Sequence, residues 1–181
     1  MTRQLAAAYA VTEHFQFENA LNYAPKEVES IIDEIINYKE AVVLGRGLAY
    51  PIALEGALKI LETNRMKVRG YTISDFYHGP VAQLQKNDLA ILLIQNGVMY
   101  DDGIKMLEKL KSVGAKTIVI TDVKSFEDKY SSVIYIESTD SEATVMFIMA
   151  LVLQLIALKL VEAKGIDPDK SNVIAKVTIT K

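Results

Sequence analysis

Apolar segments and segments of helical period alternate along most of the chain. The short apolar segments predict five strands, over residues 40–47, 67–73, 88–95, 115–121 and 131–138. Apolar residues at helical spacing predict the intervening helices, over residues 2–22, 25–38, 48–62, 101–114 and 143–163. The third of the predicted strands is apolar throughout, which is typical of a strand covered on both faces.

Strands that alternate with helices indicate βα units, and such units build a parallel sheet. We therefore expect an α/β fold with three αβα layers, in which a five-stranded parallel sheet carries helices on both faces. Sites in such sheets lie beyond the carboxyl ends of the strands. Gly45 and Gly47 close the first strand, so they are expected at that edge. A weak boundary near residues 22–25 separates the first helix, within residues 1–23, from a domain over residues 24–181.

Composition excludes several classes of protein. A net charge of -3 gives no basic footprint for nucleic acid. The chain has no cysteine, which excludes disulfides and thiol catalysis and is compatible with a reducing cytoplasm. The apolar stretch over residues 143–163 is long enough to span a membrane, but Gln154 and Lys159 interrupt it, so we predict a buried helix and no membrane. With two histidines, no G-x-G-x-x-G and no Walker loop, neither a metal nor a nucleotide cofactor is expected.

Three charged residues share one line on an apolar helix. On a wheel of about 100° per residue, Glu55, Lys59 and Glu62 fall within roughly 60° of each other. Because this polar stripe is narrow, we expect the charges to sit in a crevice. One interpretation is an ion pair between Glu55 and Lys59, with Glu62 in solvent. The other is a carboxylate in a partly dry pocket that moves a proton, with the neighbouring ammonium tuning its pKa.

Three further positions carry candidate chemistry with an open interpretation. His78 lies in "SDFYHGP", where it either passes a proton or binds backbone in a tight loop. The glycines of "GRG", residues 45–47, supply either an ordinary turn or a close approach of backbone to a ligand. Lys176 lies in the polar tail, where the pattern alone predicts a solvated side chain.

Three segments together resemble a known family. "LGRGLAYPIALEGALKILE", residues 44–62, closely resembles the start of the second sugar-isomerase (SIS) domain of the glucosamine-6-phosphate synthase family. "HGPVAQL", residues 78–84, is similar to that family's H-G-P-x-A-x-[LI] loop, and "SNVIAKVTI" is similar to its C-terminal tail. "MTRQLAAAYAV" resembles the helix that closes the first SIS domain. The resemblance therefore implies a flavodoxin-like SIS domain over residues 24–181, preceded by a helix over 1–23 that belongs to a missing SIS domain.

The resemblance also implies a reaction and roles. The family isomerises fructose 6-phosphate to glucosamine 6-phosphate, so a hexose or hexosamine 6-phosphate is the implied ligand. Glu62 matches the glutamate that moves the proton between C1 and C2, and His78 matches the histidine that assists ring opening from the neighbouring subunit of a dimer. Lys176 matches the lysine that engages the open-chain carbonyl. Glu55 and Lys59 match residues that support the site, and Ala175, beside Lys176, is expected to contact the substrate.

The sequence departs from the family pattern at two places. The family's usual G-E-L-K-H-G-P reads S-D-F-Y-H-G-P here, a segment that varies among relatives that isomerise, deaminate or deglycate other sugar phosphates. The family's phosphate-binding S-x-S-G-x-T loop has no match in this chain. We therefore expect the isolated chain to be inactive or very weak. A deaminase or deglycase, and a SIS module that binds a sugar phosphate without chemistry, stay open as alternatives.

Overall fold

The computed structural model describes residues 26–126, 132–137 and 142–167. The helix expected within residues 1–23 lies outside the described residues, as do Ala175 and Lys176 in the tail. The division of the chain into residues 1–23 and 24–181 therefore stays a prediction.

One parallel sheet forms the centre of the fold, as the alternating pattern predicted. Its strands are β1 (Glu40–Gly45), β2 (Lys67–Thr72), β3 (Leu89–Ile94), β4 (Lys116–Thr121) and β5 (Val133–Tyr135). They lie in the order β2-β1-β3-β4-β5, and every neighbouring pair is parallel. All six residues of β3 are buried, because this strand is central and covered on both faces.

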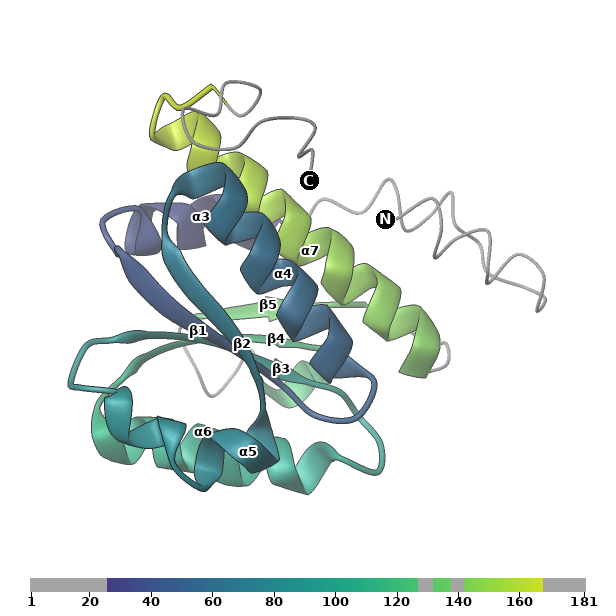
Figure 1. The fold of residues 1–181 in the computed structure, drawn as a ribbon. Coiled ribbons are helices and arrows are strands. Elements are labelled where there is room, and N and C mark those ends of the chain that lie inside the picture. The colour runs from purple at the N-terminus through teal and green to yellow at the C-terminus, as the bar shows by residue number, and fades with distance from the viewer. Residues whose placement is uncertain (1–25, 127–131, 138–141, 168–181) are drawn as a thin grey trace, which may run out of the picture.

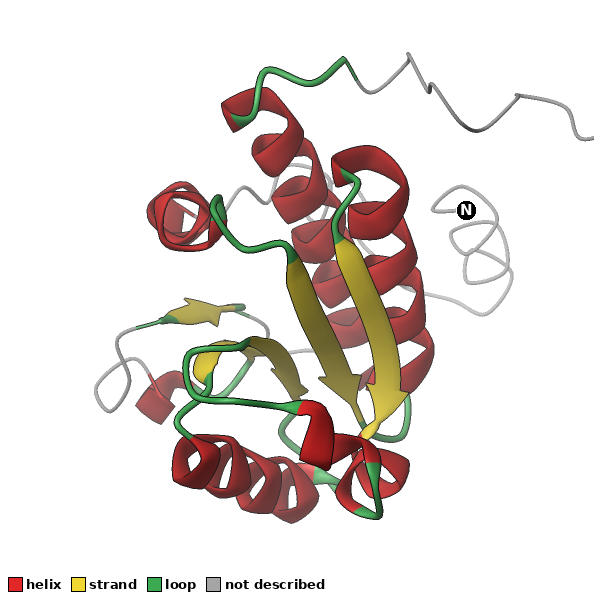
Figure 2. Cartoon of the chain, turned by 60° about the vertical axis from the view of Figure 1, so that its left-hand side comes forward, coloured by secondary structure: helices red, strands yellow, loops and turns green. Residues whose placement is uncertain are grey.

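Helices cover both faces of the sheet and complete the expected three layers (Figures 1 and 2). One layer holds α3 (Lys26–Ile35), α4 (Ala49–Asn64) and α7 (Glu142–Ala163), and the other holds α5 (Ile73–Tyr77) and α6 (Tyr100–Val113). Two short 3-10 turns, Pro80–Gln83 and Lys124–Phe126, lie in the connections. Each layer packs its own apolar cluster against the sheet, so the sheet separates two halves of the core.

The long apolar helix α7 is a core helix, as predicted. It is the one helix of the described ranges that is long and apolar enough to cross a membrane, and 67% of its most apolar window is buried inside the fold. It packs against both α3 and α4 on one face of the sheet. Its apolar residues therefore bury against protein, and Gln154 and Lys159 fall on its less buried side.

Candidate functional site

The charged line on α4 is a connected set of ions. Lys59 Nζ donates a hydrogen bond to Glu62 Oε2 at 2.9 Å and lies 3.8 Å from Glu55 Oε1. The hydrogen bond to Glu62 raises the pKa of Lys59, and the charge of Glu55 acts in the same direction. The Lys59 ammonium therefore bridges two carboxylates. Its shorter contact is with Glu62, whereas the spacing along the helix had suggested a pair with Glu55.

Burial differs along this line. The side chain of Glu55 is 11% exposed, whereas those of Lys59 and Glu62 are 35% and 39% exposed. The expectation of a crevice is thus confirmed for Glu55 and wrong for Glu62 in this chain. The reason is that the buried face of α4, which includes Ala53, Ala57 and Ile60, lies away from Glu62, and the leucine side of the helix next to Glu62 faces outward.

A ridge of exposed leucines flanks the charged line. Leu54, Leu58 and Leu61 of α4 are 44%, 44% and 41% exposed, and Leu158 of α7 is 47% exposed. We call these four residues the leucine ridge. Three of them share one side of α4, whereas Leu158 lines a small crevice with Lys59 and Thr63 on the other side of the charged line. Exposed apolar side chains that form a patch mark surfaces that bind another protein.

Glu55 also has an unsatisfied atom. Its Oε1 is buried and accepts no hydrogen bond from any described residue, because Lys59 is too distant at 3.8 Å. Buried polar atoms in native structures nearly always have a partner, in the protein or bound to it. Glu55 therefore offers a ready acceptor beside the ion pair of Lys59 and Glu62.

His78 lies on the other side of the sheet from this line. It caps the C-terminal end of α5, where its backbone N–H donates to the Asp75 carbonyl at 3.2 Å, and its side chain is exposed. It lines a crevice of about 330 Å³ with Ser74, Asp102 and Lys105. Because α4 and α5 belong to opposite layers (Figure 1), one chain does not bring Glu62 and His78 together.

The "GRG" turn makes a second crevice at the carboxyl edge of the sheet. A cavity of about 350 Å³ opens where β1 and β3 end, which is the point where the strand order reverses. A side chain at Gly45 would come within 2.4 Å of the Ala49 carbonyl oxygen, so glycine permits β1 to turn directly into α4. Within the described residues, the close approach is to the chain's own backbone, which supports the turn interpretation.

Acidic groups dominate this edge. Glu142 opens α7, and Asp101 and Asp102 occupy the first turn of α6. Asp122 accepts a hydrogen bond from the Asn96 backbone N–H at 2.7 Å. Its pKa is raised chiefly by burial, and the charge of Glu142 raises it further. Since like charges repel, this edge disfavours a phosphate group.

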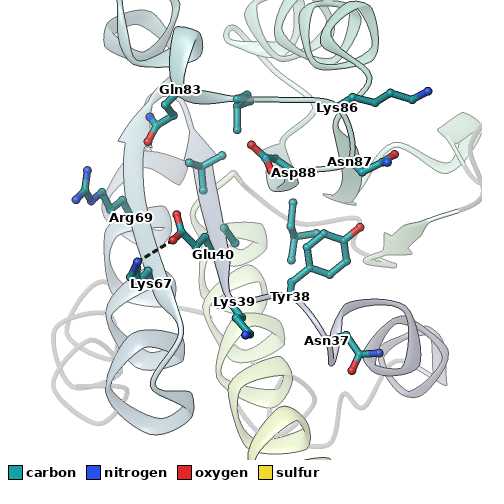
Figure 3. A pocket seen from close by; sticks show the side chains of 14 residues that line it. Asn37, Tyr38, Lys39, Glu40, Lys67, Arg69, Gln83, Lys86, Asn87 and Asp88 are labelled. Atoms are coloured by element: carbon teal, nitrogen blue, oxygen red, sulfur yellow. Dashed lines mark hydrogen bonds and ion pairs between the residues drawn. The ribbon is translucent and has the colours of Figure 1, made fainter.

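A larger groove lies elsewhere, at the amino ends of β1, β2 and β3. It measures about 670 Å³ and is drawn in Figure 3. Glu40 is already paired with Lys67 at 2.9 Å, and the side chains of Arg69 and Lys86 point away from the groove (Figure 3). No set of unpartnered polar groups converges there among the described residues, so its size alone does not make it the site.

Sequence reasoning missed one residue at the carboxyl edge. Arg46 donates from Nε to Asp102 Oδ2 at 3.1 Å and from a terminal guanidinium nitrogen to Ser74 Oγ at 2.9 Å. The available signal was its position between two glycines, but the partners lie 56 and 28 residues away along the chain. Over the ranges that the structure covers, no cluster of His, Cys, Asp and Glu could hold a metal ion.

Comparison with known proteins gives the same assignment as the three segments. The sequence model of the SIS domain matches residues 34–162. A glutamine–fructose-6-phosphate aminotransferase [isomerizing] of Rhizobium leguminosarum is 30% identical over 86% of this chain and 26% of the relative, so the chain spans about a quarter of that protein. The solved C-terminal domain of glucosamine-fructose-6-phosphate aminotransferase from Francisella tularensis aligns at TM-score 0.72 and 26% identity, covering 80% of this chain and 41% of that domain.

A third comparison concerns the fold alone. The structure of glucosamine-6-phosphate deaminase from Thermotoga maritima aligns at TM-score 0.69 and 22% identity, over 97% of this chain and 53% of the deaminase. The fold is thus similar both to that of the aminotransferase domain and to that of a glucosamine-6-phosphate deaminase. The family-model match covers most of the described fold, and the chain belongs to the SIS domain family.

Proposed function

We propose that this chain is the isomerase-type SIS domain of an amino-sugar synthase and that it acts on fructose 6-phosphate to form glucosamine 6-phosphate. The observation that carries this proposal is the ion-paired line of Glu55, Lys59 and Glu62, which stands on an outward face of α4 in a chain of the SIS family. The aminotransferase names of the Rhizobium and Francisella relatives support the same substrate class.

Glu62 is the proposed proton carrier. In the protonated C2 imine of the open-chain sugar, its carboxylate takes the proton from C1; the electrons of that C–H bond form a C1–C2 double bond, and the π electrons of the C2–N double bond move onto nitrogen to give an enolamine. The same carboxyl then returns the proton to C2, while the C1 hydroxyl loses its proton to solvent and becomes the aldehyde, which completes the isomerisation. Lys59, whose pKa is raised, stays cationic and holds the Glu62 carboxylate through their hydrogen bond. Glu55 is proposed to support the site through its ion pair with Lys59.

His78 is proposed to act on the sugar held by a second copy of the chain, where it assists ring opening. The position of the sheet supports this role: it lies between α5 and the charged line, so His78 cannot reach the Glu62 of its own chain. The leucine ridge supports a homodimer, because it leaves four large apolar side chains exposed on α4 and α7. The dimer completes a site that one copy leaves in two parts.

The remaining roles come from the resemblance. Lys176 is proposed to engage the open-chain carbonyl and Ala175 to contact the substrate, both from the tail. The helix within residues 1–23 is proposed to pack with a preceding SIS domain, and the protein to work in the cytoplasm.

Phosphate binding is proposed to lie outside this chain. The acidic carboxyl edge repels a phosphate, and Arg46, the cation of the crevice there, is already paired with Asp102. The isolated chain is therefore expected to turn over hexose phosphates weakly or not at all. A preceding SIS domain would supply the phosphate-binding residues that this chain lacks.

Deuterium exchange into the sugar tests the role of Glu62. This chain replaces its matched segment in the Francisella C-terminal domain, and incorporation of solvent deuterium at C1 and C2 is followed by NMR. Glu62→Gln is expected to slow exchange by about 10²-fold or more, as loss of a general base does. Glu162→Gln on α7 is the matched control, since Glu162 pairs with Lys159 at the same i,i+3 spacing and the same 2.9 Å. Equal exchange in the two variants would remove Glu62 from the role of base.

The same preparation separates the alternative functions. Release of ammonia from glucosamine 6-phosphate, with Glu62-dependent exchange but no synthesis, would indicate a deaminase or deglycase. This alternative is favoured by Phe76 and Tyr77, which precede His78 where the synthase pattern differs. Binding of the sugar phosphate without exchange would indicate a regulatory module instead.

A further inference from the structure

Arg46 joins three elements at the carboxyl edge. It lies in the turn between β1 and α4, and its guanidinium contacts Asp102 of α6 at 3.1 Å and Ser74 of α5 at 2.9 Å. A planar guanidinium carries donors that point in fixed, different directions, so one side chain holds two partners at once. The crevice that contains His78 is bounded by the same two partners, Ser74 and Asp102.

The short helix α5 depends on such contacts. It has only five residues, and isolated helices shorter than roughly 12–15 residues are marginal in water. Ile73 and Phe76 anchor it in the core from below, and Ser74 anchors it from the side through Arg46. Ser74 Oγ also shares a hydrogen bond with Thr72 Oγ1 at 3.1 Å, which links the end of β2 to the same point.

His78 takes its position from α5. Its backbone caps the helix through Asp75, and its exposed side chain has no hydrogen bond or ion pair to a described residue. The direction of the imidazole is therefore set by the backbone of residues 73–78 rather than by a partner on its ring. Anything that fixes α5 also fixes His78.

The Arg46 contacts contribute more to the position of α5 than to the unfolding free energy of the chain. The side chains of Arg46 and Asp102 are 35% and 41% exposed, and ion pairs at such exposure contribute little to unfolding free energy. They restrict local geometry instead, because they span elements that lie 56 and 28 residues apart. This also gives a role to the arginine of "GRG", which the glycine turn alone leaves unexplained.

We propose that Arg46 is a positioning residue that holds α5 and thereby orients His78 for its reaction. The importance of that orientation rests on the proposed function, in which His78 acts on the sugar of a second copy. Loss of Arg46 frees the first turn of α5 without removing its core residues, so the fold persists while the histidine loop gains alternative positions.

NMR of the whole chain tests this proposal. With two histidines in the chain, the imidazole signals are few, and His78→Gln assigns the signal of interest. Arg46→Gln is expected to shift the His78 signal and speed amide exchange in residues 76–78 on the order of tenfold, as loss of a charged hydrogen bond does. Arg46→Lys should not restore either property, since one ammonium cannot contact both partners. Arg69→Gln, an exposed arginine change on β2, is the control and should leave both unchanged.

A second variant keeps the test decisive if Arg46→Gln fails to fold. Ser74→Ala removes the same hydrogen bond from the α5 side and is expected to change the His78 signal in the same direction. Unchanged His78 signals and exchange rates in both Arg46→Gln and Ser74→Ala would overturn the proposal. If the signals move while deuterium exchange into the sugar does not, the positioning role stands and the proposed chemistry of His78 is refuted.

Discussion

Replacing Gly56 with alanine tests how closely α4 packs on α7. A Cβ atom at this position would lie 2.4 Å from Leu153 Cδ1 and 3.0 Å from Leu153 Cβ and Cγ. The first distance is about 1 Å shorter than the lower end of normal carbon contact, which is roughly 3.5–4.0 Å. Leu153 is fully buried, so its side chain cannot move aside into solvent. The two helices must therefore separate, or Leu153 must leave its preferred rotamer.

The expected cost follows from two opposing terms. Overpacking of this kind costs about 1–3 kcal/mol, whereas alanine in a helix interior is favoured over glycine by about 0.5–1 kcal/mol. The net destabilisation is then up to about 2.5 kcal/mol, or a Tm lower by up to about 10 °C for a chain of this size. Because Gly56 lies beside Glu55, movement of α4 also displaces the charged line.

Chemical denaturation of the wild-type chain and three variants measures this packing. Leu153→Ala alone is expected to cost about 2–5 kcal/mol by leaving a cavity. In that background Gly56→Ala should be neutral or stabilising, since the added methyl enters space that Leu153 has vacated. The pair should thus show a favourable coupling of at least 1 kcal/mol, within the range of about 0.5–3 kcal/mol seen for contacting residues. Stabilisation by Gly56→Ala in the wild-type chain would refute the close approach of α4 and α7.

Three further predictions concern charge and assembly. Asp122→Asn should stabilise the chain at pH 7 by less than about 1 kcal/mol, because burial raises the pKa of Asp122 and so disfavours its charged form in the folded chain. The gain in unfolding free energy should fade as pH falls through that raised pKa and vanish below about pH 4, and urea titrations at several pH values would measure it. Glu34→Gln should cost up to about 1 kcal/mol at pH 7, since the hydrogen bond from Lys116 lowers the pKa of Glu34, and the difference should disappear as pH falls through that lowered pKa. Leu58→Glu should weaken dimerisation in sedimentation experiments without lowering Tm, and an unchanged dimer would exclude the leucine ridge as the interface.

The sequence predicted the layers of this fold well because each strand carries its own signal. The apolar runs of β3 and β4 and the Gly114 stop after α6 are local patterns, which burial on both faces and helix ending impose directly. The charged line was equally local, since helical spacing alone places Glu55, Lys59 and Glu62 together.

Other features depend on contacts between distant segments. Whether α4 is covered on its leucine side cannot be read from α4, so the crevice expected around Glu62 was wrong for this chain. The partners of Arg46 lie in two other elements, and Glu34 meets Ser132 across 98 residues. Only the strand order brings such groups together, and the strand order has no local signal.

The central claim is that this chain supplies catalytic groups while the phosphate-binding residues lie in another domain. Calorimetric titration with fructose 6-phosphate tests this claim most directly. The isolated chain is compared with the same chain placed in the Francisella C-terminal domain, with the molecular mass of each measured alongside. A folded dimer of the isolated chain should give no binding, and the restored domain should bind. Micromolar binding by the isolated chain, about −8 kcal/mol, would contradict the claim and show that these residues hold a complete sugar-phosphate site.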